Sequence, residues 1–450
     1  MLSDLKGYEE VDCICETDDS PIPWCDIFAE RKAEIETNPH VLIIGAGQTG
    51  LQVGARFKQR NIPALIIEQN ARVGDNWRKR YPTLTLHTIR KQHEMLYAPY
   101  PSNWPMFTPR DKLADWLEQY ARTQDLVVWT NSTIVPKPNY DHAQKRWDVV
   151  INRGGTEITM HPAHIVLATG GLGVPRIPEL LDQESFKGEA FHASRYAGGH
   201  LYTGKHAIVV GAGNTSIDIC QDLSIRGAAS VTMIQRSSTC VVSKTNVAPK
   251  LAASWHDDKS PEVGDFTFTS MPLRLLKKIF QSHQEATWAE EAELHEKLKK
   301  AGLKLNIGPE GQGQLLLVFE RLGGYWLDKG GAELIASGKI KIKNGAEPVR
   351  YTETGLVFSD GSELQADLVV YATGYNSIRD ANKELFGADI IDETDEAIGL
   401  DEEGEFRGSY RPSGHPGLWY ATGDFYVSRI MSRILAIQIK ALELGLIPNA

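Results

Sequence analysis

Two glycine-rich turns, 166 residues apart, constrain this chain more than any other feature. The apolar run 41–44 leads into the first turn, and the apolar run 207–210 leads into the second. Their residues are Gly45, Ala46, Gly47, Gln48, Thr49 and Gly50, and Gly211, Ala212, Gly213, Asn214, Thr215 and Ser216. A glycine turn between a strand and a helix lets the backbone approach a pyrophosphate, and the helix N-terminus attracts its charge. The pair therefore predicts an α/β chain with two interleaved Rossmann-like domains, each binding a dinucleotide.

The strand after each turn ends in residues that distinguish the two ligands. The run 64–67 ends at Glu68, followed by Gln69, and a carboxylate there binds the adenosine ribose and repels a 2′-phosphate. The run 231–234 leads instead to Arg236 and Ser237, a guanidinium and a hydroxyl that match a 2′-phosphate. We therefore expect FAD in the first site and NADPH in the second. The alternative is that Arg236 is only a solvated residue at a strand end.

Length and charge bear on the partners. The 450 residues are enough for two or three domains, and 42% hydrophobic with 24% charged residues is typical of a soluble protein. The net charge of −10 comes without a basic stripe, which argues against nucleic acid as a partner. We expect small-molecule partners, and the oligomeric state stays open.

The cysteines and apolar runs bear on location. The five cysteines form no C-x-x-C or C-x-x-x-x-C pair, which indicates reduced thiols and a cytoplasmic protein; they are Cys13, Cys15, Cys25, Cys220 and Cys240. No second Cys or His pair lies near Cys13 and Cys15, so we expect no metal site. Charged and polar residues interrupt the run 430–447, and we expect neither an export signal nor a membrane span.

Two later strands that end in tight turns, residues 166–171 and 368–375, mark where such a chain crosses between domains. They predict a first domain interrupted by the second. The expected divisions are an N-terminal arm at 1–37, the FAD-binding domain at 38–178 and 375–450, and the NADPH-binding domain with a helical insertion at 179–374. Within the insertion, residues 272–303 have helical spacing and form either a roof over the active site or a solvated helical pair.

The segment between the glycine turns carries a family resemblance. Phe186, Gly188, His192 and Tyr196 follow the order F-x-G-x-x-x-H-x-x-x-aromatic, which resembles the signature of class B flavoprotein monooxygenases. The segments that resemble those around the flavin in these enzymes are 74–78, 81–82, 84–87, 372–375 and 421–424. The Leu-x-Leu-His run at 84–87 resembles the flavin-containing monooxygenase branch with the plant indole-pyruvate (YUCCA-type) enzymes and related fungal proteins.

The resemblance implies an NADPH- and O₂-using monooxygenase that oxygenates a small organic substrate through a C4a-(hydro)peroxyflavin. N-oxygenation, S-oxygenation and decarboxylation of a 2-oxo acid are the expected reactions. The cofactors supply the chemistry while the protein supplies geometry and excludes water, so no catalytic residue is predicted. His87 stands where animal and bacterial flavin-containing monooxygenases carry Asn, so we do not expect this chain to share their substrate range. Tyr196 stands where the Baeyer–Villiger signature has Trp, and Baeyer–Villiger oxidation is kept as the alternative.

The resemblance also implies further cofactor contacts. These expected residues are Asn76, Trp77, Leu86, His87, Thr373, Gly374 and Asp424. His87 is either a hydrogen-bond donor in the reaction or a structural neighbour of the flavin, and Trp77 is either a flavin contact or a core residue. Asp424 lies near the flavin or serves only as a turn and N-cap residue. His192 is expected to act in the linker between domains rather than in chemistry.

Two remoter functions stay open. An FAD/NADPH reductase or oxidase would use the same paired fold, but a disulfide reductase needs two redox cysteines, and no pair here has the required spacing. A non-catalytic sensor would bind cofactor without turnover, and the intact glycine turns and Glu68 argue against such decay.

Overall fold

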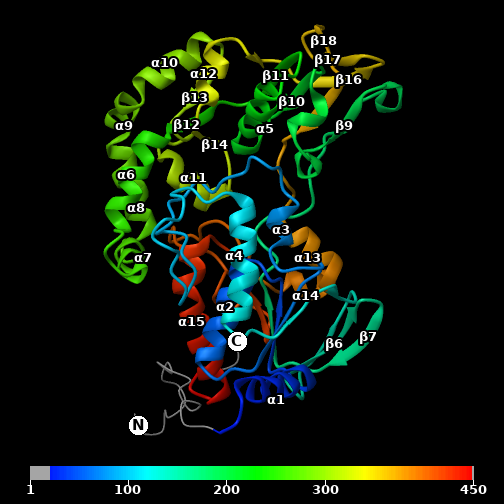
Figure 1. The fold of residues 1–450 in the computed structure, drawn as a ribbon, viewed down its shortest axis with the longest axis vertical. Coiled ribbons are helices and arrows are strands. Elements are labelled where there is room, and N and C mark those ends of the chain that lie inside the picture. The colour runs from blue at the N-terminus through cyan, green and yellow to red at the C-terminus, as the bar shows by residue number, and fades with distance from the viewer. Residues whose placement is uncertain (1–20, 448–450) are drawn as a thin grey trace.

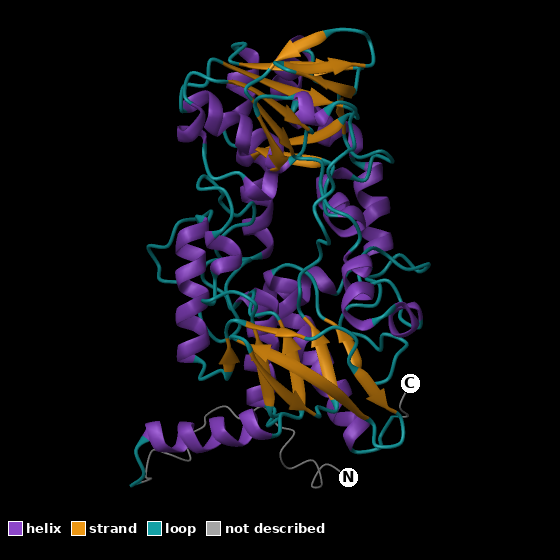
Figure 2. Cartoon of the chain, turned by 90° about the vertical axis from the view of Figure 1, so that its right-hand side faces the viewer, coloured by secondary structure: helices purple, strands orange, loops and turns teal. Residues whose placement is uncertain are grey.

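The computed structural model describes residues 21–447, and it places two parallel β-sheets at opposite ends of an elongated molecule (Figure 1 and Figure 2). The first glycine turn follows a strand of the lower sheet, and the second follows a strand of the upper sheet. Helices and loops between the sheets join the two halves. Most of the predicted N-terminal arm, residues 1–20, lies outside the described residues, and its remainder forms helix α1 (Trp24–Thr37).

The first sheet has five parallel strands in the order β20-β8-β1-β2-β3. Their bounds are β1 Val41–Ile44, β2 Ala64–Ile67, β3 Val128–Trp129, β8 His164–Leu167 and β20 Leu418–Tyr420. Val41 and Ile43 pack in one buried cluster with helices α2 (Gln48–Gln59), α4 (Arg110–Thr123) and α15 (Phe425–Glu443). Leu42 points the other way, onto β4 (Ser132–Ile134), β5 (Asn139–Asp141), β6 (Arg146–Arg153) and β7 (Thr156–Met160). Because both faces are covered, the strands are apolar throughout.

The second sheet repeats this plan with the parallel order β15-β11-β10-β19-β9. Its strands are β9 Glu189–His192, β10 His206–Val210, β11 Ser230–Gln235, β15 Ile340–Asn344 and β19 Leu368–Tyr371. One face packs on α5 (Asn214–Ile225), α10 (Ala292–Lys300) and α12 (Gly331–Ala336). The other face packs on the antiparallel strands β16 (Pro348–Thr352), β17 (Gly355–Phe358) and β18 (Glu363–Gln365). The predicted α/β fold with two Rossmann-like domains is confirmed, whereas the exact domain boundaries stay a prediction.

A helical insertion interrupts the second domain after β11. It contains a small parallel sheet of β12 (Thr239–Ser243), β13 (Leu305–Asn306) and β14 (Tyr325–Asp328). Its helices are α6 Lys244–Ser254, α7 Pro261–Thr269, α8 Leu273–Ser282, α9 Gln284–Glu290, α10 and α11 Gly313–Arg321. Short helices elsewhere are α3 Asp75–Arg78, α13 Ile378–Phe386 and α14 Ala388–Asp392, with 3-10 turns at Gln183–Ser185, Ala193–Arg195 and Gly199–Tyr202.

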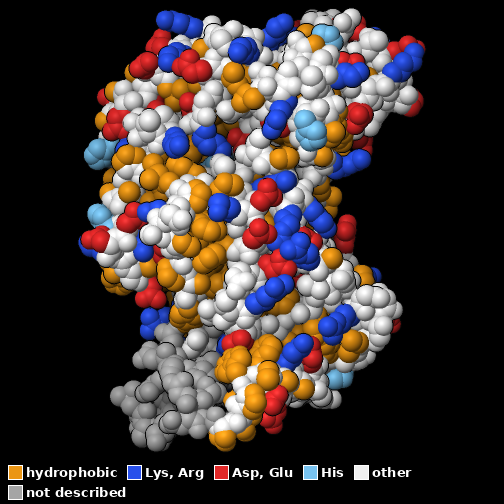
Figure 3. All heavy atoms as spheres, in the orientation of Figure 1, with side chains coloured by type: hydrophobic (Ala, Val, Ile, Leu, Met, Phe, Trp, Pro, Cys, Tyr) orange, Lys and Arg blue, Asp and Glu red, His pale blue; other side chains and the backbone are white. Residues whose placement is uncertain are grey.

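One face of the molecule shows how charge is distributed. Basic and acidic side chains alternate over its centre and right side, and apolar side chains gather on the left over the helical insertion (Figure 3). Exposed apolar residues of the insertion include Phe266 and Leu275. Among the described residues, every helix is too short or too polar to cross a membrane.

The C-terminal end of α15 is fastened to the base of the first sheet. Glu443 pairs with His40 just before β1 and with Lys440, 2.9 Å away on its own helix. His164 lies beside His40, and its Nδ1 accepts a hydrogen bond from the Trp419 indole at 3.2 Å. None of His40, His164 and Glu443 lines the large cavity between the two sheets.

Candidate dinucleotide-binding cavity

A cavity of about 1400 Å³ lies between the two sheets, and residues of both glycine turns line it. The predicted residues that line it are Gln48, Trp77, Leu86, His87, Gly211, Ala212, Gly213, Asn214, Thr215, Ser216, Arg236, Ser237, Thr373, Gly374 and Asp424. The other predicted residues do not line it; they are Gly45, Ala46, Gly47, Thr49, Gly50, Glu68, Gln69 and Asn76. The second turn thus faces the cavity along its whole length, while the first faces it through one residue.

The first turn permits only glycine at two positions. Gly45 has a φ of +107°, and a Cβ there would lie 2.5 Å from the carbonyl oxygen of Ala168. A Cβ at Gly50 would overlap the carbonyl oxygen of Gly45. Gly47 caps the N-terminus of α2, so the free N–H groups of that helix point out of the turn. This is the backbone shape that a pyrophosphate needs.

The second turn has the same construction. Gly211 has a φ of +128°, and a Cβ there would overlap the carbonyl oxygen of Ala372. Ala168 and Ala372 play matching roles because each follows the strand directly beside its glycine strand, β8 beside β1 and β19 beside β10. Ser216 replaces the third glycine, and its fully buried Oγ has no hydrogen-bond partner in the protein.

Glu68 ends β2 with its carboxylate buried. One oxygen accepts a hydrogen bond from the backbone N–H of Ala46 at 2.9 Å, and the other accepts two from Asn70. The side-chain nitrogen of Asn76 lies 3.4 Å from the Cβ position of Gly47, so Asn76 lies beside the first turn. Gln48 donates to the carbonyl of Gly423 at 2.7 Å, which ties this turn to the start of α15.

Arg236 and Ser237 follow β11 at the rim of the cavity. The Arg236 side chain is 69% exposed, and its Nε lies 4.0 Å from a carboxylate oxygen of Glu347, which also lines the cavity. An exposed pair at this distance is weak, so the guanidinium remains able to bind an anion. Its position next to two serine hydroxyls, Ser237 and Ser238, fits a phosphate group.

His87 and Trp77 lie on the first-domain side of the cavity. Desolvation lowers the pKa of His87 to about 3, and the nearby charges of Lys329 and Arg80 add to that effect. The imidazole is therefore neutral at physiological pH. Trp77 packs against both large hydrophobic cores, and its buried indole nitrogen has no partner in the protein.

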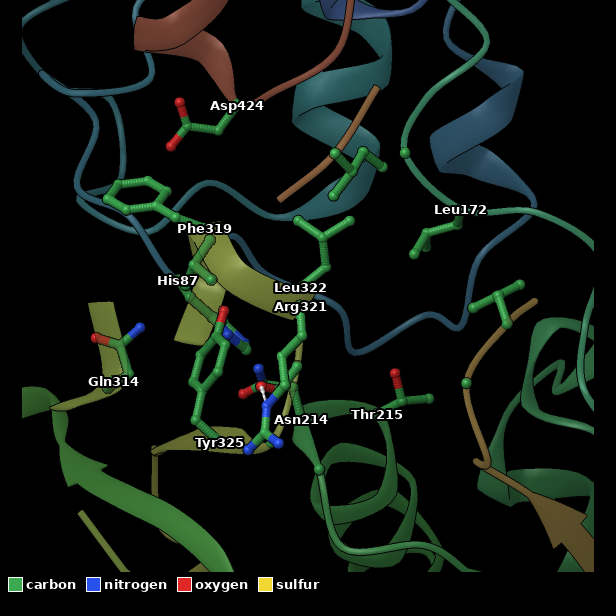
Figure 4. A pocket seen from close by; sticks show the side chains of 18 of the residues that line it. His87, Leu172, Asn214, Thr215, Gln314, Phe319, Arg321, Leu322, Tyr325 and Asp424 are labelled. Carbon is green, nitrogen blue, oxygen red and sulfur yellow. Dashed lines mark hydrogen bonds between the residues drawn. The ribbon is translucent and has the colours of Figure 1, made fainter. Parts of the chain in front are cut away.

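Asp424 stands at the first-domain end of the cavity and points into it, above Phe319 (Figure 4). It caps α15, since its side chain accepts a hydrogen bond from the Val427 N–H at 3.3 Å. Desolvation raises its pKa to about 7. A carboxyl group at this pKa can hold or release a proton near neutral pH.

The F-x-G-x-x-x-H-x-x-x-aromatic segment links the domains. His192 ends β9, and its Nε2 donates to the carbonyl of Gly374 at 2.9 Å, where the chain leaves the second sheet. Tyr196 donates to Asp222 of α5 at 3.0 Å. A Cβ at Gly188 would overlap the carbonyl of Asp367. These contacts support a structural role for His192, beside the cavity that it also lines.

Several lining residues carry no motif and were not predicted. Arg321, Leu322 and Phe319 come from α11 and its end, and Figure 4 shows them pointing into the cavity with Tyr325 and Gln314. Helix α6 contributes Val247 and Leu251. None of these lining residues belongs to a cofactor-binding motif, so the sequence did not single them out. Residues 272–303 were expected to form either a roof over the active site or a solvated helical pair. All of this stretch is described, and it supplies no residue to the cavity lining.

The polar atoms of the cavity lining fit FAD and NADPH. Four of its lining side chains hold buried polar atoms without protein partners: Ser216, Trp77, Gln92 and Tyr426. Together with two backbone cradles that exclude a Cβ, these atoms fit two dinucleotides. Cys220 and Cys240 are buried, burial raises the pKa of Cys240 to about 12, and neither lines the cavity; Cys13 and Cys15 lie outside the described residues.

Comparison with known proteins places this geometry in a family. Residues 38–380 match the flavin-binding monooxygenase-like family. The chain is 28% identical over 348 residues to indole-3-pyruvate monooxygenase YUCCA1 of Oryza sativa subsp. japonica, covering 75% of this chain and 77% of that protein. It is 31% identical over 361 residues to the probable indole-3-pyruvate monooxygenase YUCCA7 of Arabidopsis thaliana, covering 78% and 77%.

Solved structures share the fold. A flavin-containing monooxygenase from Stenotrophomonas maltophilia superposes with a TM-score of 0.58 at 18% identity, over 89% of this chain and 98% of that one. An open crystal structure of cyclohexanone monooxygenase superposes with a TM-score of 0.64 at 15% identity, over 90% and 88%. The chain belongs to the flavin-binding monooxygenase-like family, and it is a flavin monooxygenase that uses FAD and NADPH.

Proposed function

We propose that FAD occupies the first glycine cradle and NADPH the second, and that their redox-active rings share the cavity between the sheets. One observation supports this most directly: Gln48 from the first cradle and residues 211–216 from the second line the same cavity. The proposed domain boundaries follow from this arrangement, with the FAD-binding domain at 38–178 and 375–450 and the NADPH-binding domain at 179–374.

The proposed contacts follow the position of each residue. Residues 45–50 hold the FAD pyrophosphate, Glu68 with Gln69 holds its ribose, and the remaining flavin contacts are Asn76, Trp77, Leu86, His87 and Asp424. Residues 211–216 hold the NADPH pyrophosphate, Arg236 with Ser237 holds the 2′-phosphate, and Thr373 with Gly374 closes the nicotinamide side. The assignment of Arg236 is supported by its exposed guanidinium at the cavity rim, which forms only a weak pair with Glu347.

Bound FAD and NADPH supply O₂ activation and the transfer of one oxygen atom to the substrate. The chain's residues then have three tasks: to bind, to orient and to exclude water. Phe319, Leu322 and Leu251 give the cavity apolar walls that exclude water. Asp424 can hold a proton near neutral pH at the end of the cavity where α15 begins.

The substrate is proposed to be a small organic molecule, with O₂ as co-substrate. N-oxygenation, S-oxygenation and decarboxylation of a 2-oxo acid are the candidate reactions, and the names of the plant relatives favour a 2-oxo acid. The three described cysteines, Cys25, Cys220 and Cys240, form no disulfide with one another, which supports a cytoplasmic location.

A spectroscopic experiment tests the cofactor assignment. The purified protein should be yellow, its flavin band should bleach under anaerobic NADPH, and the band should return in air. A panel of amines, thioethers, ketones and 2-oxo acids should then be scored by O₂ uptake coupled to product, with hydrogen peroxide measured beside it. A colourless protein would refute the proposal, and stimulation by ketones alone would indicate Baeyer–Villiger oxidation instead.

A variant tests the second cradle. Arg236→Ala should raise the KM for NADPH roughly tenfold or more and leave that for NADH unchanged, because a charge-assisted hydrogen bond contributes about 1.5–3 kcal/mol. Arg350→Ala is the matched control: its side chain is 53% exposed, it faces Asp182 at 3.9 Å, and it does not line the cavity. If Arg236→Ala prefers NADPH as strongly as the control does, the 2′-phosphate assignment fails.

A further inference from the structure

A segment of the first domain is packed into the core of the second. Tyr81 and Leu84 follow α3 of the first domain, yet both belong to the buried cluster that contains Ile217 of α5 and the strands of the second sheet. In Figure 1 this part of the chain, drawn in blue, rises past α3 to the level of β14, beneath α5. The segment ends at Leu86 and His87, which line the shared cavity.

A buried polar network fastens this segment to α5 and β14. Tyr81 donates a hydrogen bond to one carboxylate oxygen of Asp218 at 2.8 Å. The Lys329 ammonium lies 3.7 Å from the other oxygen and donates to the Thr85 hydroxyl at 2.8 Å. Asp218 and Lys329 are 6% and 19% exposed. A nearly buried carboxylate and ammonium are stable only while they stay paired, so the two charges hold each other in place.

The network links the helix of the second cradle to the His87 segment. Asp218 lies one helical turn after residues 214–216, which form the second cradle at the start of α5. Thr85 lies two residues before His87, on the side of the cavity where the flavin contacts are proposed. Figure 4 shows His87 and Thr215 at the same cavity, on chain segments from different domains.

We propose that Asp218 and Lys329 are positioning residues that hold the His87 segment to α5, so that the position of this segment depends on the second domain and on the ligand bound there. The inference rests on the proposed function for its consequence: occupancy of the NADPH cradle then stabilises the position of His87 in the cavity. Neither residue lines the cavity, so both act through Tyr81 and Thr85.

Hydrogen exchange of the flavin-bound protein tests the network directly. In Lys329→Met and Asp218→Asn, amides of residues 80–90 should exchange about tenfold faster or more, because loss of a buried partner favours local opening. Lys329→Arg should restore slow exchange, since it keeps the charge. Lys297→Met is the matched control, because Lys297 lies in the same domain and pairs at the surface with Glu293 and Glu333. If the amides of residues 80–90 exchange in both variants at the rate of the parent protein, the inference is overturned.

A ligand fragment tests the consequence. In the parent, 2′,5′-ADP should slow exchange at residues 211–216 and also at 80–90; in Lys329→Met the slowing should remain at 211–216 and disappear at 80–90. Slowing confined to 211–216 in the parent would overturn the inference. Absence of any effect at 211–216 would instead refute the NADPH assignment, and the ligand-free comparison would still decide whether Asp218 and Lys329 hold the segment.

Discussion

Removal of the Asp265 carboxylate tests how the helical insertion is attached to the first domain. Asp265 on α7 accepts two hydrogen bonds from Arg429 on α15, each 2.6 Å, and a third from the Trp255 indole at 2.8 Å. Both charged side chains are 2% exposed. Asp265→Ala removes the carboxylate that is hydrogen-bonded to Arg429 and leaves its guanidinium with the carbonyls of Gln92 and Glu94. Removal of one partner from a buried ion pair costs about 3–5 kcal/mol.

Urea unfolding followed by tryptophan fluorescence measures this loss. Asp257→Ala is the matched control from the same insertion: it removes an ion pair with Arg90 at 2.9 Å, but Asp257 is 69% exposed, so the cost is at most about 1 kcal/mol. The double variant Asp265→Leu with Arg429→Met should recover most of the stability, because it removes both charges together. Equal losses in Asp265→Ala and Asp257→Ala would refute the reasoning.

Three further predictions follow from single positions. Gly213→Ala should fold normally, since its Cβ meets nothing closer than the Tyr325 oxygen at 3.9 Å, yet bind NADPH at least about tenfold more weakly in a titration because the methyl group blocks the pyrophosphate; parental affinity would contradict this. The pKa of Asp424, about 7, exceeds its ordinary value of about 3.9, so the folded state binds more protons than the unfolded state between these values. The free energy of unfolding should therefore decrease as the pH rises from about 4 to about 7. Asp424→Asn should flatten that slope in urea midpoints, and parallel pH curves for parent and variant would show that Asp424 is solvated. The pKa of His87, about 3, keeps its imidazole neutral, so His87→Asn should leave the shape of the pH profile of NADPH oxidation unchanged above about pH 5. A step near pH 6.5 that the variant abolishes would disprove this.

The two cradles could be predicted because their determinants are local in the chain. A turn such as Gly45–Gly50 joins a buried strand to a helix within six residues, and only glycine fits at Gly45, against the carbonyl of Ala168 just after the neighbouring strand. The same rule applies to Gly211 and Ala372. Sequence spacing alone therefore indicated a paired dinucleotide-binding fold, which the structure and the family comparison confirm.

The cavity walls could not be predicted because they depend on contacts between distant segments. Leu251 and Phe319 lie on helices of the insertion that carry no cofactor motif, and they line the cavity while residues 272–303 do not, although Leu273 packs in the same buried cluster. Likewise, the contacts of Asn76 with Gly47 and of Gln48 with Gly423 join segments that are distant in the sequence.

The two domains exchange segments, and this exchange determines how the cavity is built. The insertion belongs to the second domain by sequence, but Trp255, Leu273 and Leu316 are buried in the first domain's core, where Asp265 pairs with Arg429. Tyr81 and Leu84 make the reverse exchange into the second core. A rotation of one domain against the other must therefore break a buried ion pair on one side or the Tyr81 anchor on the other. Each exchanged segment carries residues that line the cavity, so the relative position of the two domains and the shape of the cavity change together.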